Sequence, residues 1–204
     1  MSHIFRLTAA FTLSAFAAAC SQAPAEPAAL TSGAWTVDSE ASELSYVTIK
    51  SGEIVEVNSF ETLTGSVSAD GAAVVEIDLA SVSTGIDIRD ERMRNVFFEV
   101  ADNPTATVTA QIDPAAFETL GLGETTSQTL DATVSVKGVE APITADIDVT
   151  RVGEDRVIAV SSAPVVVYAD ALDLTGGLTQ LQELAGLPSI TPAVPVTFAL
   201  TFER

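Results

Sequence analysis

The chain has 204 residues, and its 28 Asp and Glu residues against nine Lys and Arg residues give it a formal net charge of −19. This charge repels nucleic acid and anionic membrane surfaces, so it excludes both as electrostatic partners. The chain has one histidine, His3, and one cysteine, Cys20, both ahead of the region expected to fold. The folded domain therefore lacks the residues for Ser-His or Cys-His catalysis, His-ligated metals and thiol redox chemistry. We expect neither a metal nor a cofactor.

Residues 1–19 have the features of a secretory signal peptide. Arg6 precedes an apolar run that is too short to cross a bilayer as a mature helix and that ends in small residues. Cys20 follows and resembles the cysteine of a bacterial lipoprotein box, although Ala17 stands where the box usually has Leu. The alternative, a secretory peptide that leaves a free thiol, is a liability in an oxidising compartment. We expect a lipid on Cys20 that anchors a periplasmic protein, and Gln22 resembles a sorting signal for the outer membrane.

Residues 20–32 begin at the lipidated cysteine and are otherwise mostly Ala, Pro, Glu, Ser and Thr. This composition can bury little apolar area, so we expect the segment to be a flexible tether. Residues 33–204 then form one domain, which is long enough to bury a core.

Apolar and polar side chains alternate along most of this domain, as they do in β-strands with one buried face. In residues 105–112, for example, Ala106, Val108, Ala110 and Ile112 share one face. Strands are expected around Trp35 and in the ranges 44–50, 60–67, 74–79, 105–112, 129–136, 142–149, 157–168 and 194–202. Lys137 and Gly138 lie between two of these ranges and predict a tight hairpin turn.

Antiparallel strands with one apolar face must close on themselves or stack, so a barrel or a sandwich follows. The expected inner face consists mostly of small or β-branched residues, which would leave space at the centre of a closed barrel. A barrel of about eight strands can hold one small apolar ligand in that space. A sandwich packed with the same residues would be thin and weakly held, so the barrel is favoured.

Two helices interrupt the strands. The first helix is expected within residues 86–104, with Asp87 as a cap, Asp90 paired with Arg94, and one face formed by Ile86, Arg89, Met93 and Phe97. The second lies within residues 178–188 and presents Leu178, Leu181, Leu184 and Ala185 on one face before the C-terminal cap Gly186. We interpret the second helix as a flap over an apolar opening.

Arg89 shares the face of the first helix that Met93 and Phe97 turn inward. An unpaired buried charge is strongly destabilising, so Arg89 must meet a carboxylate, main-chain carbonyl groups or a ligand head group. We favour a structural partner over a head group. Arg92 and Arg94 are expected to be solvated.

Several short motifs occur in an order that resembles a known family. They are Trp35, Val37 and Asp38, then Ser81–Gly85, Arg89-Asp90, Met93-Arg94, Phe97-Phe98, Asn103-Pro104, Lys137-Gly138-Val139 and Pro142. This series resembles the YceI family of lipocalin-like periplasmic proteins across essentially the whole domain. Two features depart from it: members typically carry histidines near the first long strand, where this chain reads "SELSYVTIK", and the Leu178 flap is longer.

The resemblance implies an all-β, lipocalin-like antiparallel β-barrel of about eight strands with one or two short helices. Members of the family hold an isoprenoid chain, such as that of a polyprenyl quinone or a polyprenyl phosphate, in an apolar channel. The ligand-binding residues expected on this basis are Arg89, Met93, Phe97, Phe98, Phe60, Leu178 and Leu181. Because Asp87, Asp90 and Glu91 interleave with the arginines, a neutral head group such as a quinone is favoured.

Two other functions fit the same residues. A filled barrel would serve as a non-enzymatic adhesion or assembly module, and paired carboxylates would permit a hydrolase. A homodimer is left open. We expect a binding protein rather than an enzyme.

Overall fold

The structure is a computed structural model that describes residue 30 and residues 33–204. The predicted signal peptide, Cys20 and all of the predicted tether except Leu30 lie outside the described residues. Within the described residues, no helix has the length and apolar character needed to span a membrane.

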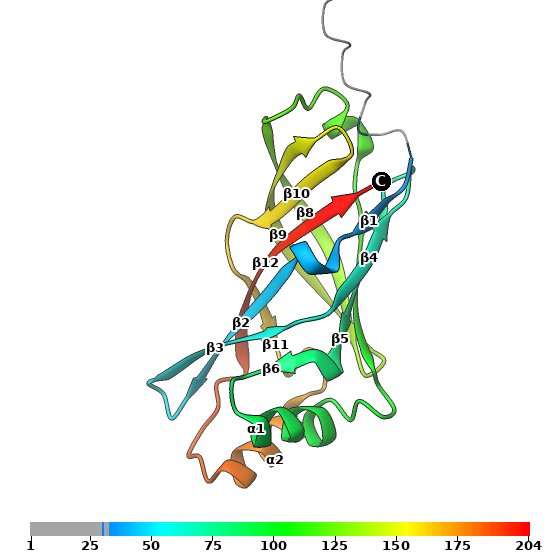
Figure 1. Cartoon of the computed structure of the whole chain (residues 1–204). Helices are drawn as coiled ribbons and strands as arrows, with labels where there is room; N and C mark the ends of the chain where they lie inside the picture. Colours follow the sequence, from blue (N-terminus) through cyan, green and yellow to red (C-terminus); the bar gives the residue numbers. More distant parts are fainter. Residues whose placement is uncertain (1–29, 31–32) are drawn as a thin grey trace, which may run out of the picture.

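Antiparallel strands close into a barrel (Figure 1). Going round the ring, its eight strands are β1 (Trp35–Val37), β4 (Leu63–Val67), β5 (Ala72–Asp78), β7 (Thr105–Gln111), β8 (Thr125–Val136), β9 (Val139–Gly153), β10 (Arg156–Ser161) and β12 (Ala193–Glu203). The first and last pair with each other, with Thr36 opposite Glu203 and Val37 opposite Phe202. The predicted closed barrel is therefore confirmed.

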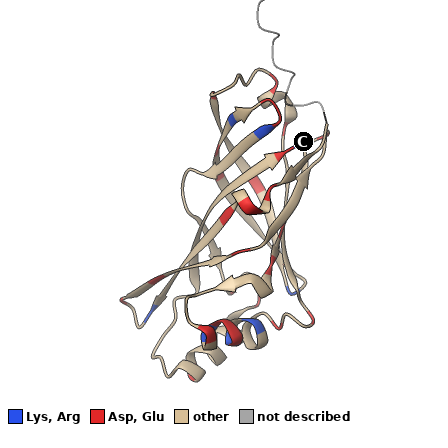
Figure 2. Cartoon of the chain, in the orientation of Figure 1, with Lys and Arg blue, Asp and Glu red and all other residues tan. Residues whose placement is uncertain are grey.

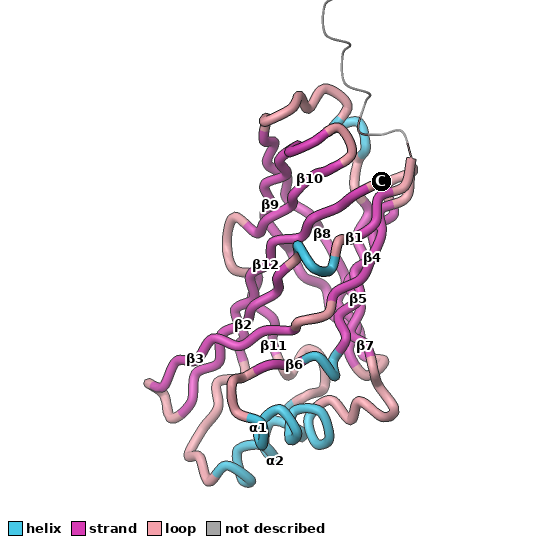
Figure 3. Tube along the Cα trace, viewed as in Figure 1, coloured by secondary structure: helices cyan, strands magenta, loops and turns pink. Residues whose placement is uncertain are grey.

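Further strands extend one end of the barrel (Figure 3). The first half of β12 pairs with β11 (Val165–Tyr168) on one side and with β2 (Glu43–Lys50) on the other. Strand β2 pairs along its length with β3 (Ile54–Phe60), whose end pairs with β6 (Val82–Ser83). The long β12 thus belongs to the closed ring at one end and to this extension at the other.

The helices lie together across the extended end of the barrel (Figures 1 and 3). Helix α1 (Asp87–Arg92) continues into a π-helical turn, η3 (Met93–Phe97), and α2 (Thr175–Ala185) packs against that turn. Short 3-10 turns occur at η1 (Ser39–Ala41), η2 (Leu79–Ser81) and η4 (Pro114–Phe117).

Two expected strands are each divided. The range 60–67 splits because the amides of Glu61 and Thr62 bond to Ser81 Oγ, at 3.1 and 3.0 Å, instead of to a neighbouring strand. Phe60 therefore ends β3, a strand that was not predicted separately, and β4 starts at Leu63. The range 157–168 splits into β10 and β11, separated by a segment that contains Pro164, which has no N–H to donate to a ladder.

The hairpin between β8 and β9 turns as predicted. Lys137 and Gly138 have φ angles of 52° and 77°, the left-handed values that a two-residue turn of type I′ requires. The strands stay in register from Val136 opposite Val139 to Thr125 opposite Thr150. On the outer face, Ser127 donates to Asp148 at 2.5 Å. Acidic residues occur along the strands and on α1, as Figure 2 shows.

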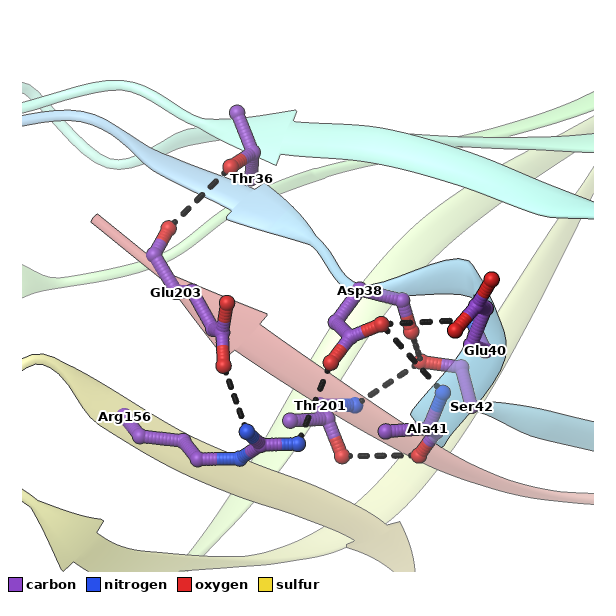
Figure 4. A network of polar contacts seen from close by, with 8 residues as sticks. All are labelled: Thr36, Asp38, Glu40, Ala41, Ser42, Arg156, Thr201 and Glu203. Carbon is purple, nitrogen blue, oxygen red and sulfur yellow. Dashed lines mark hydrogen bonds and ion pairs between the residues drawn. The ribbon is translucent and has the colours of Figure 1, made fainter.

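A polar network holds the barrel closed where β1 gives way to β2 (Figure 4). Arg156 of β10 donates to Glu203 of β12 at 2.5 Å and to Asp38 at 3.1 Å. Asp38 also accepts from the amides of Glu40 and Ala41 and so caps η1. Thr201 of β12 donates its hydroxyl to the Ala41 carbonyl at 2.8 Å. The side chains therefore tie the turn to two strands of the ring.

Candidate functional site

The barrel encloses a channel with a cavity volume of about 480 Å³. The inward-facing residues of β7 and β8 that line it are those predicted from the alternation, among them Ala110 and Ala132, which lie opposite each other. The channel is lined from Gly33 and Trp35 at one end to Leu178 and Ile190 at the other. Its volume lies within the range of roughly 300–1,000 Å³ typical of small-molecule sites. The predicted space at the centre of the barrel is therefore present.

Trp35 and Phe117 are buried at the end away from the helices. The Trp35 indole donates to the Leu30 carbonyl at 2.9 Å, and Arg204 stacks on its ring with 5.0 Å between Cζ and the centroid. Nearby, the guanidinium of Arg151, which is 3% exposed, donates to main-chain carbonyls that include that of Leu120 at 3.2 Å. These contacts fix the loops around this end of the channel.

Aromatic side chains line the end near the helices. The π-helical turn places Met93, Phe97 and Phe98 all in buried positions, with the Phe98 amide bonded to the Met93 carbonyl at 2.9 Å. Phe98 contacts Phe97 at 4.8 Å and Phe60 at 5.8 Å between ring centroids. Phe60 in turn lies 5.4 Å from the ring of Tyr46. The wider turn explains why two consecutive phenylalanines can both face the channel.

Helix α2 covers this end. Leu178 and Leu181 pack against the core and line the channel, whereas Leu184 is 50% exposed, so its predicted place on the apolar face is wrong. The predicted cap is confirmed, because Gly186 is left-handed with a φ of 62°. Gly177 allows the close approach of the helix, since a Cβ there would lie 3.1 Å from a ring carbon of Phe97.

The inner face of β2 and β3 becomes polar toward their hairpin. Leu44 lies opposite Phe60, Tyr46 opposite Asn58, and Thr48 opposite Glu56. All of these except Glu56 line the channel, and Lys50 follows them at the end of β2. The predominantly apolar channel therefore has a polar sector at its helical end.

Glu56 is the centre of a charged cluster in this polar sector. It accepts from Lys50 Nζ at 2.6 Å and from the Arg89 guanidinium. Burial acts to raise the pKa of the Glu56 carboxyl, but the hydrogen bonds from Lys50 and Arg89 outweigh it and hold that pKa below its usual value. Arg89 also donates to the Thr84 hydroxyl and carbonyl, both at 2.9 Å. The expectation that Arg89 meets a carboxylate and a main-chain carbonyl is confirmed.

Other expectations for the first helix are wrong. Ile86 is 46% exposed and occupies the cap position, while Asp87 is the first helical residue and its side chain makes no capping bond. Asp90 accepts from the Thr84 amide at 2.9 Å, and Arg94 points to the Ala80 carbonyl at 3.5 Å, so the predicted pair between them does not form. Asp90 instead accepts from Thr84, because the backbone amide of Thr84, which precedes the helix, needs a hydrogen-bond partner.

Arg92 also differs from expectation, because it is half-buried and lines the channel instead of being fully solvated. The residues predicted to bind ligand all line the channel and gather at its helical end: Arg89, Met93, Phe97, Phe98, Phe60, Leu178 and Leu181. Their role in binding stays a prediction. No cluster of His, Cys, Asp or Glu that could hold a metal ion occurs in the part of the chain that the structure describes.

Tyr46 and Asn58 were not predicted as site residues, yet they are only 6% and 5% exposed. Tyr46 Oη and Asn58 Oδ1 have no hydrogen-bond partner among the described residues. A buried polar atom left unsatisfied costs about 1–3 kcal/mol. The signal was present in "LSYVTIK", where polar residues at positions 46, 48 and 50 share a face with Leu44.

Residues 35–202 match the family model of the YceI-like domain. This chain belongs to the YceI-like family. The match spans the whole barrel and both helices, so the family resemblance seen in the motifs is confirmed. Among curated proteins, none matches the chain.

Two solved structures are similar to this YceI-like protein. It is 37% identical to a polyisoprenoid binding domain from Saccharophagus degradans implicated in plant cell wall breakdown, with a TM-score of 0.81 over 84% of this chain and 99% of that one. BcnA of Burkholderia cenocepacia is 20% identical, with a TM-score of 0.62 over 81% of this chain and 98% of that one. The second likeness shows the shared fold.

Proposed function

We propose that this protein binds a hydrophobic isoprenoid-type lipid with a neutral, quinone-like head group and carries it in the bacterial periplasm. The observation that carries the proposal is the continuous apolar channel of about 480 Å³ with one polar sector. The name of the Saccharophagus degradans domain supports the ligand class. In this proposal a lipid on Cys20 attaches the protein to the outer membrane, and the protein is not an enzyme.

The charge of the chain as a whole supports a neutral head group. Glu56 already neutralises part of the charge of Lys50 and Arg89, and the chain as a whole has a net charge of −19. An anionic head group would approach against this field, most strongly at low salt. A neutral quinone head group is not repelled by this negative charge, and the apolar chain of the quinone would contact the strands and Phe97.

A substitution inside the channel tests the proposal. Ala110→Phe would place a ring in the channel, while Thr109→Phe places the same ring on the outer face of the same strand as a matched control. We expect native protein and the Thr109→Phe variant to yield a co-purified isoprenoid lipid by mass spectrometry of an organic extract. The Ala110→Phe variant should yield much less. Equal absence of lipid from all three, with no binding of added polyprenyl quinone, would favour the filled barrel of an adhesion or assembly module.

Competition between ligands tests the head group. A polyprenyl quinone and a polyprenyl phosphate of equal chain length are compared at low and high salt. We expect the quinone to bind more tightly at low salt. Tighter binding of the phosphate that weakens as salt rises, and that is lost in Arg89→Ala, would show that the arginines bind an anion.

A further inference from the structure

We infer that Tyr46 and Asn58 form a head-group site that selects a neutral hydroxyl, so that the protein binds a phenol or a quinol in preference to the oxidised quinone. This inference rests on the proposed function, because it assigns the chemistry of the head group in the same channel. It goes further by predicting which redox form is bound.

The two side chains are neighbours that face the channel. Tyr46 on β2 lies directly opposite Asn58 on β3, and both line the cavity. They are 6% and 5% exposed, so bulk water does not satisfy them. Tyr46 Oη and Asn58 Oδ1 are the buried side-chain atoms without a hydrogen-bond partner among the described residues. Two such atoms on adjacent strands indicate a site that a ligand completes.

Neighbouring contacts orient both groups. Asn58 Nδ2 donates to Thr48 Oγ1 at 3.1 Å, and this bond leaves Oδ1 as the unused atom of the amide. The ring of Tyr46 packs on Phe60 with 5.4 Å between centroids. Burial raises the pKa of the Tyr46 phenol, so this hydroxyl keeps its proton at neutral pH. The site therefore offers one acceptor that has no hydrogen, and one hydroxyl that can donate.

The hydrogen-bonding capacity of the ligand then decides between head groups. A ligand hydroxyl can donate to Asn58 Oδ1 and accept from Tyr46 Oη, which satisfies both atoms. A quinone carbonyl can accept from Tyr46 but leaves Asn58 Oδ1 without a donor. A phosphate dianion has only acceptor oxygens and would repel Asn58 Oδ1. Sites built to bond a hydroxyl reject analogues that lack it, because buried polar groups are then left unpaired.

The position of the pair suits a head group at the end of an apolar chain. On one side of the pair, the inner face of β2 and β3 is apolar at Leu44 and Phe60. On the other side it becomes polar at Thr48 and charged at Lys50. Phe97 and Phe98 cover the same end from the helices. A prenyl chain in the channel can thus place the first polar group of the ligand beside Tyr46 and Asn58, short of the charges.

The test measures binding of a geranylgeranyl-substituted benzoquinone, the quinol made from it by addition of two electrons and two protons, and the dimethyl ether of that quinol. Geranylgeranyl hydrocarbon without a head group serves as the reference ligand. We expect wild-type protein to bind the quinol at least about tenfold more tightly than the quinone or the ether. A tenfold preference would raise the midpoint potential of the bound couple by about 30 mV, which redox titration reads independently.

Asn58→Leu and Tyr46→Phe remove one group each, and Ser45→Ala on the outer face of β2 is the control. Asn58→Leu should abolish the preference for quinol, Tyr46→Phe should weaken quinol and quinone binding, and neither should weaken binding of the hydrocarbon. Without ligand, Tyr46→Phe should melt at a higher temperature than wild type, since it removes an unsatisfied buried hydroxyl and no hydrogen bond. A lower melting temperature, or equal binding of quinol and quinone by wild type, overturns the inference. Failure of every ligand to bind, the hydrocarbon included, overturns the proposed function instead.

Discussion

At the scale of single residues, Glu56 links two charged partners in the polar sector of the channel, and these partners lie on two different elements. It joins Lys50 at the end of β2 to Arg89 on α1, and its side chain is 26% exposed. Removing its charge leaves two half-buried cations beside each other. The ion pairs therefore hold the β2–β3 hairpin against the first helix.

Glu56→Gln should lower the free energy of unfolding by about 1–2 kcal/mol at pH 7. This loss lies between the loss expected for an exposed ion pair and that expected for a buried one. Because the folded-state pKa of Glu56 lies below its unfolded value, this contribution is full at neutral pH and is lost as pH falls through the lowered pKa. Urea unfolding from pH 7 to pH 3 checks this: the difference between wild type and variant should shrink below roughly pH 4. Glu53→Gln, an exposed site on the same hairpin, should change little at any pH.

At the scale of elements, the contact between α2 and the π-helical turn determines how the channel is covered. A Cβ added to Gly177 would contact Phe97, whereas a Cβ added to Gly176 would have no heavy atom within 4 Å. The two neighbouring glycines therefore form a matched pair for testing whether α2 acts as a cover.

Gly177→Leu should push α2 away from Phe97 at a cost of roughly 1–3 kcal/mol, and Gly176→Leu should not. We expect faster amide hydrogen exchange in residues 175–185 and faster release of bound polyprenyl quinone for the first variant alone. If both variants release the ligand at the wild-type rate, α2 does not cover the exit.

A second element-scale prediction concerns the closure of the barrel. Asp38 caps η1 and pairs with Arg156, so Asp38→Ala removes both the cap and the ion pair that ties the turn to β10 (Figure 4). We expect a loss of about 1–2 kcal/mol in chemical unfolding. Glu40→Ala on the same turn is the control, because the described structure shows only its main chain in this network. Equal loss in both variants would show that the turn itself, and not the Asp38 carboxylate, matters.

At the scale of the whole molecule, the proposed attachment to a membrane would depend on Cys20, which precedes the described barrel. The net charge of −19 opposes adsorption to anionic lipid, so attachment should depend on the acyl chains alone. Cys20→Ser should move the protein from the membrane fraction to the soluble periplasm and abolish the acyl mass shift of the N-terminal peptide. Unchanged fractionation of this variant would contradict lipidation at Cys20.

The sequence by itself determined the strands of the barrel wall and the side chains that face inward. The alternation of Ala106, Val108 and Ala110 has the period of a strand, and this period is a local property of the backbone. The Lys137-Gly138 turn and the Gly186 cap were predictable for the same reason, since each depends on left-handed backbone at one or two residues.

Only the tertiary structure decided how the site is assembled. Arg89 finds Glu56 through contact across 33 positions of the chain, which no local pattern predicts. Phe98 joins Phe97 in the channel because a π-helical turn replaces the regular helix, and Leu184 is exposed because α2 packs through Gly177 and Leu181. Tyr46 and Asn58 become a pair through the register of β2 on β3. Strand period and turn conformation are set by neighbouring residues, whereas register and packing depend on which distant surfaces meet when the barrel closes.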